Sequence, residues 1–344
     1  MVLSVETKDL NGNLISDGEF QRIAFATEGE QTQFLTFLER EKFLPSLENL
    51  GISCVLVTPE LAKKVPPHIK GIYVCDRPKS ALFQLHNALS RKKEYAGEPF
   101  SSVAGRNCDI SPLAVIDSQN VTIGDDVTIA PFAVVKGRVR IGNHVVIHSG
   151  AVIGGKGFSF SKDENGNNMP VTDTAEIILE DNVQIFEGVN ISTGIFPWEK
   201  TVIGENTKVD AHCHLGHGAH IGKNCLLAAG CLCCGNSRIG DNTWVGVGAI
   251  VSNRVKVGNN ARVSIGSVAT KDVPDGVTVT GNFAIPHATF LRNLKASLSD
   301  SSTAPNSATK KLENISGGGG RVTVLYTSIF WNASLWRVAR KEAA

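Results

Sequence analysis

The segment Val202–Val263 reads VIGENTKVDAHCHLGHGAHIGKNCLLAAGCLCCGNSRIGDNTWVGVGAIVSNRVKVGNNARV. An aliphatic or small apolar residue falls at every sixth position, from Ile203 to Val263 without a break. A period of six is a multiple of the strand period of two and fits no helix repeat. Each group of six therefore predicts a short strand with one inward residue and a turn. A slower period of eighteen is set by Gly204, Gly222, Gly240 and Gly258, each followed two places later by Asn.

Eighteen residues are three groups of six, which predicts one triangular coil. Gly and Asn both tolerate positive φ, so we expect them to form the corners together. Hexapeptide repeats of this kind are typical of parallel β-helices, whose coils stack about 4.8 Å apart around an aliphatic column. Gly124 and Gly142 already show the spacing of eighteen, and we expect the β-helix to begin near Cys108.

Two segments interrupt the hexapeptide pattern. Gly154–Ala175 is polar and rich in Gly and Asn, and the pattern resumes after it as if a loop merely protruded. Loops that leave a rigid scaffold commonly carry function. Gly194–Lys200 reads GIFPWEK and shifts the phase by two residues, which is compatible with a plain surface bulge or with a functional loop.

The chain on either side of the coils differs in pattern. Two strand-like runs and a helix opening after a proline precede them, at Ile52–Thr58, Ile69–Cys75 and Pro78–Ser90. A helix pattern follows the coils, and a Ser/Gly-rich segment then leads to an aromatic and basic tail. The predicted fold is mainly β, a parallel β-helix with a small N-terminal α/β domain and a C-terminal helix. The expected segments are 1–104, 105–281, 282–298 and a flexible linker and tail at 299–344.

Composition narrows the classes of function and location. A formal net charge of +1 gives no reason to expect a nucleic-acid partner. The N-terminus lacks the apolar core of a signal peptide, and no run of 18 apolar residues predicts a membrane span, so we expect a cytoplasmic protein. Eight cysteines in a chain of 344 residues predict no disulfide framework. The tail could contact a membrane peripherally as an amphipathic helix, or be a docking or disordered segment.

Polar residues concentrate in VDAHCHLGHGAHIG, which contains Asp210 and four histidines. None of these side chains occupies an inward position, so we expect all of them to project outward. A histidine facing a cleft between subunits can act as a general base near neutral pH. The alternative is a row of solvated or interfacial histidines. The four are His212, His214, His217 and His220.

A metal site is a further alternative for these histidines. His212 and His217 are five apart, as zinc ligands can be, and a γ-carbonic anhydrase type of site would need a third histidine. The upstream candidates, His144 and His148, lie more than three coils away. We therefore expect no metal site and no cofactor.

Three further motifs complete a family resemblance. Gly155–Phe158 reads GKGF, and the chain closes its folded part with GNFAIPHATFLRNL at Gly281–Leu294. Together with the α/β region, the hexapeptide coils and VDAHCHLGHGAHIG, they resemble UDP-3-O-acylglucosamine N-acyltransferase, the LpxD family of lipid A biosynthesis. The similarity covers about residues 20–298 and is strongest in Val202–Val263.

The resemblance implies a left-handed β-helix that forms a homotrimer, with its active sites in clefts between subunits. It also implies transfer of a 3-hydroxyacyl chain from acyl carrier protein to the 2-amine of a UDP-3-O-acylglucosamine. On the matching motifs, His217 would be the catalytic base and Asp210 the carboxylate that orients it. The oxyanion donor would be the backbone N–H of Gly235, one coil beyond the base. Gly157 and Phe158 would shape the sugar-nucleotide side of the cleft.

Several positions depart from the family pattern. The residues that would hold uracil fall on Phe37, Arg40 and Phe43, which allows stacking but lacks the Asn of the family. Arg254 stands where the family has a second histidine, and it can bind substrate but cannot act as a base. Residues 192–194 read Ser-Thr-Gly where the family has Asp-Arg-Gly.

These departures leave two alternative functions open. One is an acetyltransferase that uses acetyl-CoA to modify a sugar amine or hydroxyl. The other is a catalytically silent trimeric scaffold. The register of His217 and Gly235 favours an enzyme, whereas the loss of the second histidine and of Asp-Arg-Gly favours the scaffold.

Overall fold

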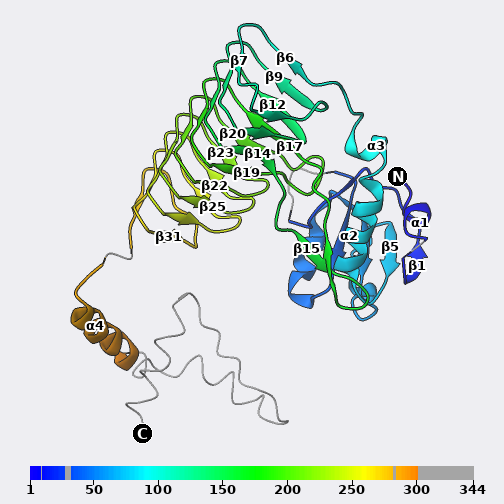
Figure 1. Cartoon of the computed structure of the whole chain (residues 1–344). Helices are drawn as coiled ribbons and strands as arrows, with labels where there is room; N and C mark the ends of the chain where they lie inside the picture. The colour runs from blue at the N-terminus through cyan, green and yellow to red at the C-terminus, as the bar shows by residue number, and fades with distance from the viewer. Residues whose placement is uncertain (9, 28–31, 282–283, 301–344) are drawn as a thin grey trace. The chain divides into compact units, whose positions relative to one another are not determined.

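The computed structural model describes residues 1–8, 10–27, 32–281 and 284–300 (Figure 1). The chain divides into two compact units at Ala284, and the first contains both the α/β region and the β-helix. The fold class predicted from the sequence is confirmed, because short parallel strands form a left-handed β-helix of hexapeptide repeats.

The β-helix has three faces, each a sheet of parallel strands stacked in register. The first face contains β7 (Asp109–Ile110), β10 (Thr128–Ile129), β13 (Val146–Ile147), β18 (Gln184–Ile185), β21 (Lys208–Val209), β24 (Leu226–Leu227), β27 (Trp244–Val245), β30 (Arg262–Val263) and β32 (Thr278–Val279). The second contains β8 (Val115–Ile116), β11 (Val134–Val135), β14 (Val152–Gly155), β19 (Asn190–Ser192), β22 (His214–Leu215), β25 (Leu232–Cys233), β28 (Ile250–Val251) and β31 (Val268–Ala269). The third contains β6 (Val103–Ala104), β9 (Val121–Ile123), β12 (Arg138–Ile141), β17 (Glu176–Leu179), β20 (Thr201–Ile203), β23 (His220–Ile221), β26 (Arg238–Ile239) and β29 (Lys256–Val257).

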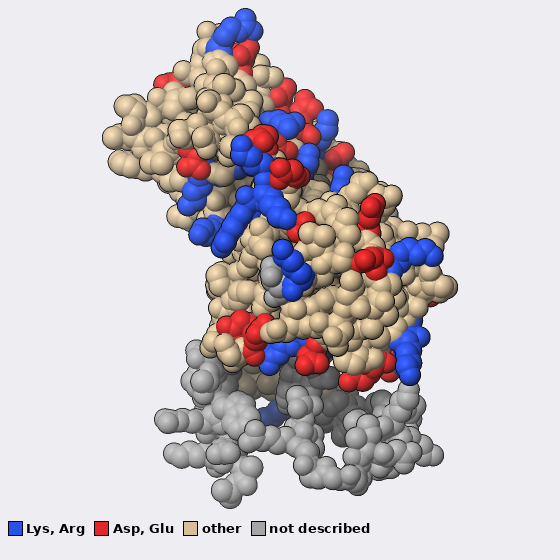
Figure 2. All heavy atoms as spheres, turned by 90° about the vertical axis from the view of Figure 1, so that its right-hand side faces the viewer, with Lys and Arg blue, Asp and Glu red and all other residues tan. Residues whose placement is uncertain are grey.

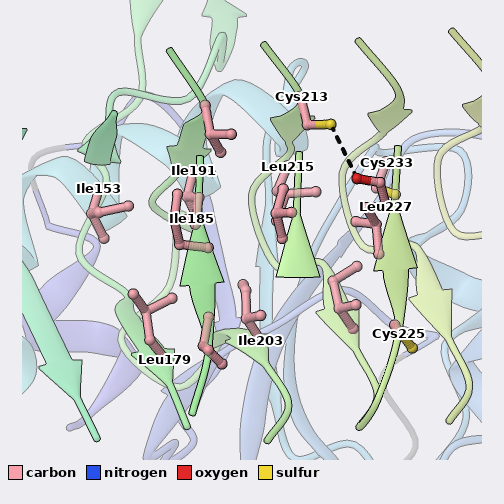
Figure 3. Close-up of a cluster of buried hydrophobic side chains, with 14 of the residues drawn as sticks. Ile153, Leu179, Ile185, Ile191, Ile203, Cys213, Leu215, Cys225, Leu227 and Cys233 are labelled. Carbon is pink, nitrogen blue, oxygen red and sulfur yellow. Dashed lines mark hydrogen bonds between the residues drawn. The ribbon is translucent and has the colours of Figure 1, made fainter. Parts of the chain in front are cut away.

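The inward residues form the continuous column that the period of six predicts. Figure 3 shows part of it, with Ile, Leu and Cys side chains from successive coils packed on one another. Leu215 lies in this column and is fully buried. Cys213 and Cys231 stack one coil apart, with their sulfur atoms 3.5 Å apart. The hydrogen bond with Cys231, together with burial, raises the pKa of Cys213. The hydrogen bond with Cys213 lowers the pKa of Cys231, but the contact with Cys233 and burial outweigh it and raise this pKa, so both thiols are packing residues rather than nucleophiles.

The coil corners use Gly and Asn for different reasons, which corrects the expectation that both adopt positive φ. Asn206 has φ of 60° and repeats this conformation one coil later at Asn224. Gly204 does not have positive φ. A Cβ on Gly204 would instead lie 2.5 Å from the backbone of Gly222 in the next coil. Glycine is therefore required there because successive coils approach closely.

The N-terminal region is an α/β layer built around a five-stranded sheet in the order β1-β5-β4-β3-β2. The predicted strands and helix occur within two residues of their expected limits, as β4, β5 and α2. The elements before the β-helix are α1 (Leu3–Glu6), β1 (Asn13–Ser16), β2 (Arg22–Ile23), β3 (Phe34–Leu38), η1 (Glu41–Glu48), β4 (Ile52–Val57), η2 (Ala62–Lys64), β5 (Gly71–Val74), α2 (Pro78–Leu89) and α3 (Lys93–Ala96).

Both interruptions of the pattern pack against this N-terminal region. The first carries an antiparallel hairpin of β15 (Phe160–Lys162) and β16 (Asn168–Pro170), and its Val171 is buried with the N-terminal aromatic residues. The second places Phe196 in the same cluster, stacked on Phe83 with ring centroids 6.4 Å apart. The segment 194–200 is therefore a docking loop and not a surface bulge.

The limits of the β-helix differ slightly from the sequence prediction. Its first strand is β6, about five residues before Cys108, because Val103 and Ala104 pair with β9. In the second unit, the predicted C-terminal helix is α4 (His287–Asp300). No helix among the described residues is long and apolar enough to span a membrane. The tail, and with it the suggested membrane contact, lies outside the described residues from 301 onward.

Charged side chains of both signs lie close together on the face that Figure 2 shows. Ion pairs on the surface, such as Arg106 with Asp125 at 2.7 Å, join neighbouring coils. This mixture agrees with the formal net charge of +1.

The inward column predicts which substitutions destabilise the fold. We expect Leu215→Ala to lower the free energy of unfolding by about 2–5 kcal/mol, because it leaves a cavity among fully buried residues. Leu50→Ala is the matched control, since Leu50 is 83% exposed, and it should change stability little. Urea denaturation measures both. Equal effects of the two substitutions would contradict the role of the column.

Candidate active site

His217 lies at the corner between the second and third faces, after β22 and before β23. Its Nδ1 is 3.3 Å from Oε1 of Glu199, which lies eighteen residues earlier, one coil below. The two side chains are only 28% and 13% exposed, so water screens their interaction weakly. This carboxylate therefore fixes the orientation of the imidazole ring.

Glu199 is itself held by the docking loop. Its Oε2 accepts a hydrogen bond from the N–H of Ile195 at 2.8 Å. Burial alone would raise the pKa of Glu199, but its hydrogen bonds from His217 and Ile195 outweigh burial and lower this pKa. The hydrogen bond to Glu199 in turn raises the pKa of His217, against the opposing effect of burial. The pair thus joins a fixed carboxylate to a more basic imidazole.

Within one chain, Asp210 does not contact His217, so its role as the orienting carboxylate stays a prediction. Its two oxygens accept hydrogen bonds from the N–H groups of Ala211 and Ala229, at 2.7 and 3.1 Å. Asp210 follows β21, so it lies at the corner between the first and second faces, whereas His217 lies at the next corner. Seven residues along the coil carry the chain across a whole face. The carboxylate that contacts the imidazole is Glu199.

Gly235 lies directly against the imidazole of His217, one coil above it. A Cβ on Gly235 would be 2.5 Å from Nε2 of His217, so only glycine leaves the ring in place. Within the described part of the chain, the N–H of Gly235 donates to no protein acceptor. Gly235 therefore offers a free N–H beside the basic nitrogen, as the register of eighteen residues predicts.

Arg254 completes this column on the side of the N-terminal region. Its backbone N–H donates to the carbonyl oxygen of Gly235 at 3.1 Å. Its guanidinium lies over the ring of Phe25, 5.0 Å from the centroid, and donates to Oγ1 of Thr27 at 3.1 Å. Its positive charge lowers the pKa of His217, opposing the larger effect of Glu199.

The other three histidines do not share this environment. His214 projects outward from the second face, and burial lowers its pKa. His220 contacts the carbonyl oxygen of Gly218 through Nδ1, at 3.1 Å. His212 occupies a corner at φ of 57°. All four project outward, as predicted, but only His217 has a carboxylate partner among the described ion pairs of these four.

A cavity of about 930 Å³ lies beside the β-helix corner, and the GKGF loop lines it. Its wall includes Gly157, Phe158 and Asp173, whereas His217 lies outside it. Phe158 is 96% exposed, and its ring meets that of Phe160 edge-on at 5.1 Å. The N–H of Gly157 donates to Oδ2 of Asp173 at 3.0 Å. The predicted loop therefore borders this cavity.

The residues expected to hold uracil lie in the N-terminal region. Phe37, in β3, is half-buried, and its ring contacts that of Phe25 edge-on at 6.4 Å. Phe43, in η1, is 50% exposed, with the amine of Lys42 over its ring. No ring contact joins Phe37 to Phe43 in the described structure. Their binding of a base stays a prediction.

Two acidic residues of this site were missed by the sequence analysis. Glu199 could have been found, because the spacing of eighteen that locates Gly235 above His217 also locates Glu199 below it. Asp173 carried no such signal, since it lies where a long polar excursion returns to the coil.

Among the described residues, no group of three or more His, Cys, Asp or Glu could hold a metal ion.

The chain is similar in sequence to one described family and to several named proteins. The family described as bacterial transferase hexapeptide (six repeats) matches residues 120–155 and 200–235. A UDP-3-O-acylglucosamine N-acyltransferase of Coxiella burnetii is 28% identical over 225 residues, which are 58% of this chain and 63% of that protein. The enzyme of the same name from Bradyrhizobium sp. is 30% identical over 227 residues, 54% of this chain and 60% of that protein.

Solved structures whose fold is similar to that of this chain include a UDP-N-acetylglucosamine acyltransferase from Campylobacter jejuni. It is 21% identical, covers 62% of this chain and 78% of its own, and has a TM-score of 0.47, too low to carry a functional inference.

The site predicts a measurable effect of Glu199 on His217. Because the carboxylate raises the pKa of the imidazole, Glu199→Gln should lower this pKa. NMR titration of the His217 ring measures the change without any substrate. Asp210→Asn is the control and should leave the pKa of His217 within experimental error. A shift with Asp210→Asn and none with Glu199→Gln would contradict the assignment.

The chain spans less than two thirds of the length of the curated relatives that it matches. Within that span, the hexapeptide match and the named relatives confirm the resemblance predicted from the motifs: this chain carries hexapeptide repeats and is similar in sequence to UDP-3-O-acylglucosamine N-acyltransferases.

Proposed function

We propose that this protein is an N-acyltransferase that moves a 3-hydroxyacyl chain from acyl carrier protein to the 2-amine of a UDP-3-O-acylglucosamine. The observation that carries the proposal is the stack of Glu199, His217 and Gly235 at one corner. A carboxylate-held base beside a free N–H is the combination that acyl transfer to an amine requires. The names of the relatives support the choice of acceptor.

The geometry assigns one role to each group. Nδ1 of His217 donates to Glu199, so the lone pair of Nε2 is free on the side of Gly235. As the amine nitrogen forms a bond to the thioester carbon, Nε2 accepts the proton from that nitrogen. The N–H of Gly235 stabilises the negative charge that develops on the carbonyl oxygen. The C–S bond then breaks, and the protonated imidazole returns the proton to the leaving thiolate.

The second face supports a homotrimer. Its outward residues form one register-aligned column, and six of the eight are aliphatic. Leu232 and Ile250 continue this column directly above His214, next to the candidate site. Asn190 and His214 interrupt the column, and the aliphatic residues on either side of them favour burial between subunits. The column is Val115, Val134, Val152, Asn190, His214, Leu232, Ile250 and Val268.

In this proposal the site is completed by a neighbouring subunit. The donor would approach along the corner between the second and third faces, where His217 lies. Gly157 and Phe158 would border the sugar nucleotide, Phe37 and Phe43 its base, and Arg254 would bind substrate beside the reacting centre. The cytoplasmic location stays a prediction.

The reaction itself tests the proposal. Purified protein should acylate the amine of UDP-3-O-acylglucosamine with 3-hydroxyacyl carrier protein, and His217→Ala should lower kcat by about 10²–10⁴-fold. His144→Ala is the control, because His144 lies at a distant exposed corner, and should retain full activity. Turnover with acetyl-CoA in place of the acyl carrier protein would favour the acetyltransferase alternative. No turnover with either donor would contradict the proposal.

The assembly is tested separately. Ile250→Asp places a charge in the aliphatic column of the second face and should convert a trimer of the 36.7 kDa chain into monomer. Lys256→Asp changes an outward residue of the third face and serves as the control. Light scattering after size-exclusion chromatography measures the mass. A monomeric wild type, or a trimer unaffected by Ile250→Asp, would contradict this arrangement.

A further inference from the structure

Three oxygen atoms converge beside Gly157 at the edge of the cavity. A Cβ on this glycine would lie 3.1 Å from Oδ1 of Asp173, 3.2 Å from Oγ of Ser159 and 3.4 Å from the carbonyl oxygen of Thr193. All four residues line the cavity of about 930 Å³. We name this arrangement the Gly157 niche. It exists only because residue 157 has no side chain.

Two of the three oxygens in the Gly157 niche, those of Asp173 and Thr193, receive no hydrogen bond from the described residues. Oδ1 of Asp173 is buried and has no hydrogen-bond partner in the described structure, although Oδ2 accepts from the N–H of Gly157. The carbonyl oxygen of Thr193 accepts no backbone hydrogen bond from the described residues. A buried carboxylate oxygen without a donor is costly, which calls for an explanation in function.

Electrostatics link the Gly157 niche to the base. Burial raises the pKa of Asp173 to about 6, while the charges of His217 and Glu199 act on it in opposite directions. Asp173 in turn raises the pKa of His217. Asp173 and His217 therefore interact electrostatically, each favouring the charged form of the other.

We infer that the Gly157 niche binds a hydrogen-bond donor of the acyl acceptor, a hydroxyl group of the sugar, through Asp173, Ser159 and Thr193. A sugar hydroxyl can donate its one proton to Asp173 and accept a hydrogen bond from the hydroxyl of Ser159, whereas a phosphate or carboxylate would be repelled by Asp173. The carboxyl group turns toward the cavity by rotation about its soft terminal torsion. The inference rests on the proposed function and makes Asp173 a determinant of specificity for the sugar.

His86 fixes the backbone that presents Asp173. Its Nε2 donates to the carbonyl oxygen of Thr172 at 2.7 Å, and its Nδ1 accepts from the hydroxyl of Tyr95 at 2.9 Å. His86 is fully buried, and burial lowers its pKa. Thr172, the residue before Asp173, is thus anchored to the N-terminal region. This anchoring pre-organises the carboxyl group of Asp173 before substrate binds.

Two independent substitutions test the Gly157 niche. Asp173→Ala removes the acceptor, and Gly157→Ala fills the space between the three oxygens at a position without positive φ. Each should raise the KM for UDP-3-O-acylglucosamine about 10-fold or more, and leave kcat within about threefold, because a ground-state contact is lost. The KM for the acyl carrier protein should not change.

Asp163→Asn is the matched control. Asp163 lies on the same excursion and its Oδ1 accepts the N–H groups of Asn165 and Asn167, but it does not line the cavity. An asparagine keeps the acceptor atom there, so the kinetic constants should stay at wild-type values. UDP-glucosamine analogues that lack single hydroxyl groups identify the donor: one of them should bind wild type and Asp173→Ala equally.

Asp173→Asn separates a binding role from a structural one. The raised pKa means that ionisation of Asp173 penalises the folded state as pH rises from about 4 through about 6. Asparagine does not ionise, so this variant should match or exceed the Tm of the wild type at pH 7.5. If its oxygen keeps the hydrogen bond from the N–H of Gly157, its amide nitrogen replaces the free acceptor Oδ1 by a donor, so the KM for the sugar nucleotide should rise. A lower Tm together with the raised KM would make the role structural and overturn the inference.

The outcomes distinguish the inference from the proposed function. If the wild type turns over and both Asp173→Ala and Gly157→Ala keep its KM, the inference alone is overturned. If the wild type neither turns over nor binds the sugar nucleotide by calorimetry, the proposed function fails, and the inference fails with it.

Discussion

The parallel pairing of each coil with the next, eighteen residues later except where an excursion lengthens the coil, is the constraint on which the rest of the structure depends. It buries one aliphatic residue in every six and repeats the direction of each side chain from coil to coil. At one corner this repetition aligns Glu199, His217 and Gly235, with a carboxylate below the imidazole and a free N–H above it. A rigid scaffold thereby sets the geometry of a reacting centre before any ligand binds.

The two excursions from the β-helix supply the acidic residues of the candidate site. Each leaves the coil, packs against the N-terminal aromatic cluster and returns with an acidic residue, Asp173 in the first and Glu199 in the second. Phe196 anchors the second, and the hydrogen bond from His86 to Thr172 anchors the first. The packing of the two excursions against the N-terminal region therefore determines where both carboxylates lie. Acidic groups near His217 stay fixed only while both loops remain docked.

The sequence predicts those features that follow from periodicity. The hexapeptide pattern predicts the column around Leu215, and its period of eighteen locates Gly235 beside His217. The same spacing of eighteen also locates Glu199 one coil below His217. The phase shift in GIFPWEK obscures this spacing, and Asp210 is nearer to His217 along the chain. Asp210 lies across a whole face, where it binds backbone N–H groups. Asp173 depends on the return path of a long polar excursion, and neither period nor motif encodes such a path.

The central claim is that Nε2 of His217 accepts the proton from the attacking amine, and chemical rescue tests it most directly. Acylation of UDP-3-O-acylglucosamine by His217→Ala should be measured with added imidazole across a range of pH. The account predicts that imidazole restores a measurable part of the lost rate, increasing with the fraction of unprotonated imidazole. An unchanged rate in His217→Ala without imidazole would contradict it, because another group would then be accepting the proton.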